Sequence, residues 1–183
     1  MGSCKGGIRE MNTQDRLKQW KIHDSMRGYF GYHLYRQMAL NKDIVIITGD
    51  LGWGLFNAHR EDMPSQFINA GASEQAMMGV ACGMALQGKT VFVYSITPFL
   101  IYRAFETIRT YVNHESIPLK LIGSGRDDDY KHDGYSHNAH DVQMVLATQG
   151  NIIQLYPDNK EDMEQTIDLM IKTDEPFFLS LKR

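Results

Sequence analysis

Short runs rich in Val, Ile, Leu and Phe alternate with longer segments of helical pattern along most of the chain. The runs are typical of buried strands, and they cover residues 43–50, 66–71, 89–95, 118–125, 151–157 and 176–183. Helical patterns cover residues 24–40, 73–86, 98–114, 139–149 and 159–172. Strands that alternate with helices indicate a parallel sheet that is covered on both faces. The sequence therefore predicts the α/β class, with three α/β/α layers around a mainly parallel six-stranded sheet.

The composition is that of one globular domain with a sizeable core. The 183 residues are 43% hydrophobic, and the formal net charge of -3 gives no sign of a nucleic-acid or membrane surface. No apolar stretch approaches the roughly 20 residues that a membrane helix needs. We expect a disordered or non-native leader over residues 1–20 and a single domain over residues 21–183. The leader has no apolar signal core, and the chain has only two cysteines, so the cytoplasm is the expected compartment.

Glu74 stands at the head of the most apolar helical segment, in "GASEQAMMGVACGMALQG". Burying the charge of a carboxylate is costly. One explanation is structural, because an anion is favoured in the first turn of a helix. The other explanation is that the carboxylate takes part in chemistry. Ligands of parallel α/β sheets bind beyond the carboxyl ends of the strands, and Glu74 follows such an end.

Two polar segments at other strand ends are further candidates. "GDLGWG" over residues 49–54 has the spacing G-x-x-G-x-G, which reverses the dinucleotide-binding fingerprint, so we interpret it as a flexible turn. "DGYSHNAHD" over residues 133–141 gathers His137, His140 and Asp141. This segment suits a metal site, a solvated loop or a loop that faces a substrate, although its spacing matches no structural zinc site.

Aromatic residues recur at helical spacing after the third predicted strand. Phe99, Tyr102 and Phe105 lie three residues apart. Such a pattern is usually the core face of a helix. Pro98 suits the first turn of a helix, so this helix begins at the carboxyl end of a strand. Its first aromatic residues can therefore face a ligand crevice instead.

Four segments together resemble the pyrimidine-binding domain of the transketolase family, which uses thiamine diphosphate. They are "SMRGYFGYHL", "GASEQAMMGVACGMALQGKTVFVYS", "PFLIYRAFETIR" and "HDGYSH", and they follow one another in the order found in the family. The resemblance extends over residues 25–183 and implies a thiamine-diphosphate-binding fold of the pyrimidine type. The last segment differs from the family's D-G-P-T-H loop at Tyr135 and Ser136, which leaves the sugar substrate unidentified.

The resemblance implies a role for each of nine residues. The cofactor-binding residues would be Glu74, Phe99, Tyr102, Phe105, Asp50 and Leu51. The substrate-binding residues would be Arg27 at a phosphate, Asp133 at a sugar hydroxyl, and His137. Glu74 and His137 would be catalytic. A glutamate bonded to the pyrimidine ring lets the cofactor's own amino group take a proton from the thiazolium carbon, and His137 would hydrogen-bond the substrate carbonyl or the developing alkoxide.

The resemblance also implies a partner. Enzymes of the family bind the diphosphate and Mg²⁺ in a separate domain, through G-D-G and a later asparagine, and no such motif occurs in these residues. We therefore expect a second subunit that carries that domain and the Mg²⁺ ligands, in an α₂β₂ heterotetramer. This chain would be one subunit of a split enzyme that transfers a two-carbon ketol unit between sugars or sugar phosphates.

Several alternative functions stay open. The same cofactor serves 2-oxoacid decarboxylases and deoxyxylulose-phosphate-synthase-like enzymes. A non-catalytic regulatory subunit would keep the fold without turnover, although the presence of Glu74 counts against it. A metal-dependent hydrolase would be built around His137, His140 and Asp141.

Overall fold

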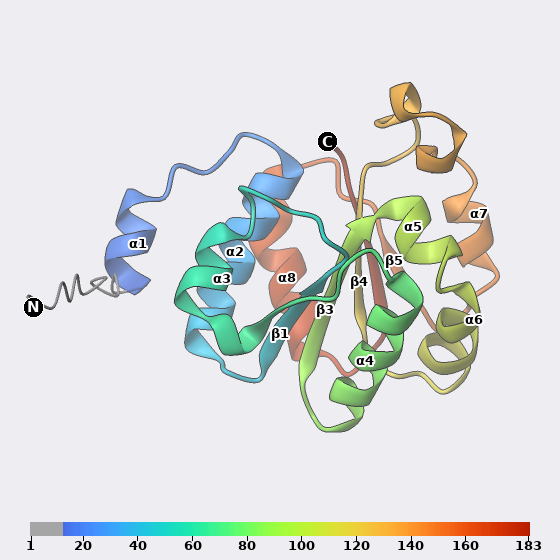
Figure 1. The fold of residues 1–183 in the computed structure, drawn as a ribbon, viewed down its shortest axis with the longest axis horizontal. Coiled ribbons are helices and arrows are strands. Elements are labelled where there is room, and N and C mark those ends of the chain that lie inside the picture. Colours follow the sequence, from blue (N-terminus) through green and yellow to red (C-terminus); the bar gives the residue numbers. More distant parts are fainter. Residues whose placement is uncertain (1–12) are drawn as a thin grey trace, which may run out of the picture.

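A six-stranded sheet lies at the centre of the computed structural model, which describes residues 13–183 (Figure 1). The strand order is β2-β1-β3-β4-β6-β5, and every pairing is parallel. The strands are β1 (Ile44–Thr48), β2 (Phe67–Asn69), β3 (Thr90–Ile96), β4 (Lys120–Ser124), β5 (Ile153–Leu155) and β6 (Phe177–Leu181). The predicted α/β class and the predicted six-stranded parallel sheet are confirmed.

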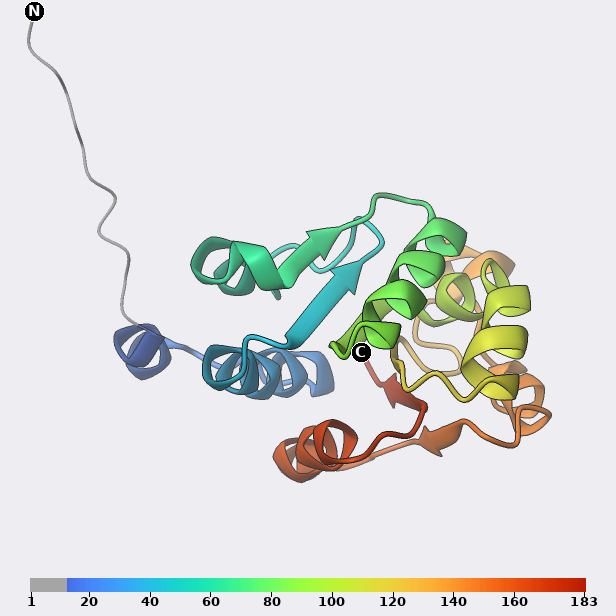
Figure 2. The ribbon, with the colours of Figure 1, turned by 90° about the horizontal axis from the view of Figure 1, so that it is seen from below.

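Helices cover both faces of the sheet (Figures 1 and 2). On one side lie α1 (Thr13–Gln19), α2 (Met26–Leu40), α3 (Asn57–Asp62) and α8 (Met163–Lys172). On the other side lie α4 (Glu74–Leu86), α5 (Thr97–Tyr102), α6 (Phe105–Thr107), the π-helical segment η2 (Ile108–His114) and α7 (Val142–Ala147). Short 3-10 helices are η1 (Pro64–Gln66), η3 (Lys131–Asp133), η4 (Tyr135–His137) and η5 (Lys160–Asp162). No helix in the described part of the chain is both long and apolar enough to span a membrane.

Side chains of successive strand residues point to opposite faces, so each central strand contributes to two hydrophobic cores. In β1, Ile44 and Ile46 pack in the core beneath α2 and α8, while Val45 and Ile47 pack in the core beneath α4 and α5. All four side chains are buried. A strand buried on both faces favours apolar residues at successive positions, which explains the run "IVII" that begins β1.

The strand order creates a crevice between the carboxyl ends of β1 and β3. The chain leaves β1 for β2 on one side and later returns to β3 on the other side of β1. At such a switch point the two connections diverge and leave room for a ligand. The backbone N–H of Gly49, just after β1, still donates to the Tyr94 carbonyl at 3.3 Å, so the two strand ends stay side by side there.

The helix predicted over residues 98–114 is not continuous. It forms α5, then α6, then η2, in which Glu115 N–H reaches back to the Thr110 carbonyl at 3.1 Å. Neither proline nor glycine stands at the breaks. Ala104, Ile108 and Val112 are nonetheless all fully buried in the core beneath α4. Tertiary packing therefore overrides the local helical pattern here.

Part of the leader predicted over residues 1–20 is helical in the structure. Residues 1–12 lie outside the described residues, but Thr13–Gln19 forms α1, which is attached to the domain. Arg16 makes ion pairs with Asp62 at 2.7 Å and with Glu61 at 3.1 Å. The ring of Trp20 packs against Tyr35, with 5.0 Å between the ring centroids. Trp20 thus covers part of the core beneath α2, and this contact attaches the segment after α1 to the domain.

His59 on α3 is buried among aromatic rings. Its side chain is 0% exposed, and its ring lies edge-on to Tyr35 and Phe56 at centroid distances of 5.3 and 5.1 Å. Burial lowers the pKa of His59 from 6.5 to about 3, although the Gly31 backbone and Asp62 oppose the shift. The folded chain therefore holds this imidazole neutral over the whole range in which an exposed histidine becomes charged.

We predict that His59 makes the protein acid-sensitive below pH 6.5. Between pH 6.5 and about 3 the unfolded chain binds a proton that the folded chain does not, so the free energy of unfolding falls as the pH falls. The slope for one such group is up to about 1.4 kcal/mol per pH unit. His59→Leu should flatten the pH profile measured by urea unfolding between pH 7 and 5. The exposed His114→Gln is the control, and an equal flattening in both variants would contradict the prediction.

Candidate active site

Glu74 is a buried carboxylate at the switch point of the sheet. It opens α4, and it is 4% exposed. A side chain added at Gly49, at the end of β1, would place its Cβ 3.8 Å from Glu74 Oε1 and 3.5 Å from the Ser95 hydroxyl near the end of β3. The carboxylate therefore lies where the ends of β1 and β3 meet, and the absent side chain of Gly49 leaves space beside it.

The Ser95 hydroxyl near this position has unused hydrogen-bonding capacity. It is buried and has no hydrogen-bond partner among the described residues. Buried polar atoms are rarely left without a partner. A ligand that carries its own donors and acceptors would satisfy this hydroxyl, so the position beside Glu74 fits a polar heterocycle.

Three further side chains continue outward from Glu74. Arg103 donates from a terminal guanidinium nitrogen to Glu74 Oε1 at 2.8 Å. The guanidinium carbon lies 3.6 Å from the centroid of the Phe99 ring. Phe99 in turn meets the His137 ring at 4.7 Å between centroids, inclined by 64°. We call these four residues the Glu74 cluster; it runs from the buried carboxylate to the surface loop that carries His137.

The other two aromatic residues of the predicted trio do not join the Glu74 cluster. Tyr102 is exposed and donates its hydroxyl to Asp141 Oδ1 at 2.6 Å, next to α7. Burial and this hydrogen bond raise the pKa of Tyr102. Phe105 is half-buried and packs against the core beneath α4. Tyr102 and Phe105 remain predictions as cofactor contacts, and in this structure both have other partners.

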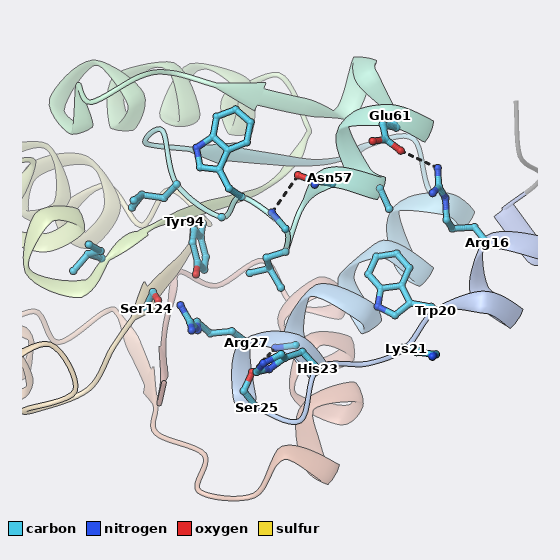
Figure 3. A pocket seen from close by; sticks show the side chains of 18 of the residues that line it. Arg16, Trp20, Lys21, His23, Ser25, Arg27, Asn57, Glu61, Tyr94 and Ser124 are labelled. Atoms are coloured by element: carbon cyan, nitrogen blue, oxygen red, sulfur yellow. Dashed lines mark hydrogen bonds and ion pairs between the residues drawn. The ribbon is translucent and has the colours of Figure 1, made fainter. Parts of the chain in front are cut away.

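A cavity of about 930 Å³ opens at the same edge of the sheet. It lies between the segment that joins α1 to α2, the loop after β1 and the ends of β3 and β4, and it is lined by Leu51 and Arg27 among others (Figure 3). We call it the Arg27 cavity. Trp20, Lys21 and His23 also line it. Sequence reasoning missed these three because they fall in or beside the predicted leader, and no local pattern marks them.

Arg27 has donors to spare inside this cavity. One terminal nitrogen donates to the Tyr130 hydroxyl at 3.1 Å, and Tyr130 lies 3.2 Å from the Ser124 hydroxyl. The Nε of Arg27 is buried and has no hydrogen-bond partner among the described residues. Burial raises the pKa of the neighbouring Tyr94, so that hydroxyl stays protonated and can donate. Arg27, Tyr94 and Ser124 point toward one another in Figure 3, an arrangement whose donors could bind an anion or a hydroxylated ligand.

The two predicted aspartates lie at the rim of this edge. Asp50 has a left-handed backbone, with φ of 57°, and its carboxylate accepts from the Asn69 side chain at 3.0 Å. Asp133 is exposed on η3, and its carboxylate lies 3.3 Å from the Nε2 of His132. Asp133 is two residues before η4, which ends with His137.

The histidine-rich loop does not assemble into a metal site. His140 Nε2 lies 2.8 Å from Asp128, Asp141 accepts from Tyr102, and the His137 ring rests on Phe99. Among residues 13–183, no three His, Cys, Asp or Glu side chains come together in a way that could hold a metal ion. The three side chains that the hydrolase hypothesis combines, His137, His140 and Asp141, have separate partners in this structure.

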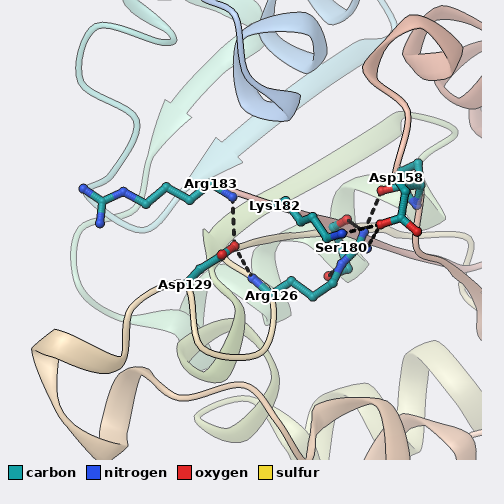
Figure 4. Close-up of polar contacts among 7 residues, drawn as sticks. Arg126, Asp129, Asp158, Ser180, Lys182 and Arg183 are labelled. Atoms are coloured by element: carbon teal, nitrogen blue, oxygen red, sulfur yellow. Dashed lines mark hydrogen bonds and ion pairs between the residues drawn. The ribbon is translucent and has the colours of Figure 1, made fainter.

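Arg126 fixes the loop that carries Tyr130 (Figure 4). Its side chain is 10% exposed and donates to Asp158 at 2.9 Å, to the Ser180 hydroxyl at 3.2 Å, and to the carbonyls of Pro157 and Ser180 at 2.8 Å. Asp129 accepts from the backbone N–H groups of Arg126 and Arg183. The loop after β4 is thus attached to the end of β6, which positions the Arg27 partner Tyr130.

Residues 24–183 match the family described as "Transketolase, pyrimidine binding domain". The chain belongs to this family, whose enzymes use thiamine diphosphate, and the predicted resemblance is confirmed. It is 26% identical over 163 residues to the "Putative transketolase C-terminal section" of Methanocaldococcus jannaschii, covering 88% of this chain and 52% of that protein. It is 31% identical over 121 residues to a subunit of the apulose-4-phosphate transketolase of Actinobacillus succinogenes, covering 66% of this chain and 39% of that protein. The chain thus spans about half the length of these relatives or less.

Solved structures share the fold. A structure described as "Split gene transketolase, inactive beta4 tetramer" matches with a TM-score of 0.77 at 24% identity, over 87% of this chain and 51% of that one. The transketolase from Leishmania mexicana matches with a TM-score of 0.76 at 15% identity, over 95% of this chain and 28% of that one. The predicted pyrimidine-type fold is therefore the observed one.

We predict that Arg126→Met lowers the free energy of unfolding by about 2 kcal/mol, because the carbonyls and Asp158 lose a charged donor in a nearly buried place. Lys182→Met is the control. Lys182 also pairs with Asp158, but it is 48% exposed, so its loss should cost less than about 1 kcal/mol. Urea unfolding of both variants measures the difference, and equal losses would show that Arg126 does not fix the loop.

Proposed function

We propose that this chain supplies the pyrimidine-binding part of a split, thiamine-diphosphate-dependent transferase of the transketolase type. The observation that carries the proposal is the buried Glu74 carboxylate at the switch point, which accepts from Arg103, whose guanidinium lies on the face of Phe99. Membership of the family and relatives named as transketolase subunits support it. The reaction would pass a two-carbon ketol unit from a ketose to an aldose, in the cytoplasm.

The Glu74 cluster fits the aminopyrimidine ring of the cofactor. Such a ring is flat, offers N–H donors and has ring nitrogens that accept. It would stack on Phe99, bond to Glu74 and give a partner to the Ser95 hydroxyl, which has none among the described residues. When bound, thiamine diphosphate supplies the carbon centre that attacks the ketose carbonyl and takes up the electron pair of the broken carbon–carbon bond.

Glu74 would hold a proton at a pyrimidine ring nitrogen. A carboxylate shares a proton with a weak base most readily where water is excluded, and Glu74 is 4% exposed. The helix that it opens supplies that dry setting, because the neighbouring Met77 and Met78 are fully buried. His137, at the outer end of the cluster, would hydrogen-bond the substrate carbonyl and the alkoxide that develops from it.

The Arg27 cavity would take the far end of the substrate. Arg27 has a buried Nε without a partner among the described residues and would bind a phosphate or a similar anion, with Lys21 and His23 on the cavity wall. Asp133, at the rim, would accept from a sugar hydroxyl. These groups favour a phosphorylated, hydroxylated substrate over a plain 2-oxoacid.

A partner subunit would complete the site. It would carry the G-D-G motif and the later asparagine, bind the diphosphate through Mg²⁺, and assemble with this chain as an α₂β₂ heterotetramer. One relative is named as a transketolase subunit and another as a C-terminal section, and both names are consistent with such a division of the enzyme.

We predict that this chain binds thiamine diphosphate tightly only together with that partner. Calorimetry with Mg²⁺ present would compare the chain alone, the partner alone and the assembled complex. In the complex, Glu74→Gln keeps the shape of the side chain but removes its charge, so turnover should fall at least 100-fold. Tight binding by no combination, or normal turnover in Glu74→Gln, would contradict the proposed function.

We predict that Arg27→Met raises the KM for a phosphorylated ketose about 10- to 100-fold, since one charge-assisted contact is worth about 1.5–3 kcal/mol. Arg36→Met is the matched control on the same helix, because Arg36 is paired with Glu164 at 2.7 Å and does not line the cavity. Steady-state kinetics with phosphorylated and unphosphorylated ketoses would test the prediction. An equal loss for both kinds of ketose would mean that Arg27 does not bind the phosphate.

A further inference from the structure

Arg103 makes two contacts at once, and both are unusual for a surface arginine. It is 47% exposed, yet it donates at 2.8 Å to a carboxylate that is only 4% exposed. Its guanidinium also lies on the Phe99 ring, with the central carbon 3.6 Å from the ring centroid. The side chain therefore reaches from solvent into the switch point and covers both Glu74 and the face of Phe99.

These two contacts are the ones that an aminopyrimidine ring would need. The proposed function requires a flat, delocalised group that stacks on Phe99 and offers an N–H to Glu74. A guanidinium is planar, delocalised and rich in N–H donors. It meets the same requirements at the same two residues, and two groups cannot share the one face of Phe99 that it covers.

We propose that Arg103 is an internal substitute for the cofactor's pyrimidine ring, which holds the site in the free chain and must leave when the ring binds. This inference rests on the proposed function and adds to it a displacement step within the chain itself. Arg103 stabilises the free chain because an unpaired buried carboxylate is costly. Arg103 lies just after α5, and its exposed half lets the side chain turn out to solvent without unfolding that helix.

The observed affinity for the cofactor is weaker when Arg103 must first be displaced. When the competent state is only a fraction of the population, the apparent dissociation constant rises by the inverse of that fraction. Arg103→Met keeps most of the side-chain length but cannot pair with Glu74. The Arg103→Met variant should therefore bind the cofactor more tightly than the native chain, although the substitution removes the ion pair with Glu74.

The first test is calorimetry of the assembled complex with thiamine diphosphate and Mg²⁺. Arg103→Met should bind about tenfold more tightly, and Arg109→Met, an exposed arginine on η2, should bind like the native complex. Equal or weaker binding by Arg103→Met would overturn the inference while leaving the proposed function in place. Absence of binding by the native complex would overturn both.

The second test needs no cofactor. Urea unfolding of the free chain would compare Arg103→Met, Glu74→Gln and the double variant in a double-mutant cycle. The inference predicts that the unfolding midpoint falls on Arg103→Met, and that the same change has a much smaller effect once Glu74 is glutamine. Additive effects would mean that the two side chains are not paired in solution, and they would overturn the inference.

Discussion

Glu74 keeps its carboxylate inside the protein because the strands on either side of the switch point leave a gap there. The sheet creates that gap through its order, since β1 and β3 are neighbours whose outgoing connections run in opposite directions. Gly49 keeps the gap open by lacking a side chain, and α4 closes it from one side with apolar residues. A charge in such a place needs a partner, and in the free chain Arg103 provides one. The other features of the candidate site follow from this arrangement. Helix α5 begins at the end of β3, so Phe99 on α5 and Arg103 just after α5 lie close to the carboxylate.

Much of this architecture could be predicted from the sequence. Runs such as "IVII" at the start of β1 are apolar at successive positions because both faces of the sheet are covered, so the parallel sheet could be predicted from the pattern. The place of the candidate site could be predicted too, because the carboxyl ends of parallel strands all lie at one edge of the sheet. Glu74, Phe99 and His137 come from separate segments that each follow a strand. In the structure Arg103 contacts both Glu74 and Phe99, and the Phe99 ring meets the His137 ring.

Other parts could not be predicted, because long-range contacts decide them. Arg103 stands in an amphipathic pattern like any exposed arginine, and only its reach to Glu74 gives it a role. Tyr102 lies three residues after Phe99, at helical spacing, but its hydroxyl donates to Asp141 and its side chain does not join the Glu74 cluster. Trp20 lies in a polar segment without helical or strand periodicity, and it is the rings beneath it that attach this segment to the fold. In each case, local pattern gave no signal of the contact.

We propose that Glu74 activates the cofactor from a dry position at the switch point. The most direct measurement is the rate at which the C2 proton of thiamine diphosphate exchanges with deuterium, followed by NMR in the assembled complex. We predict fast exchange in the native complex and a rate at least 100-fold lower in Glu74→Gln, as expected for a lost acid–base group, with the cofactor still bound. Equal exchange rates in the two complexes would contradict it, and Glu74 would then be a structural carboxylate at the start of a helix.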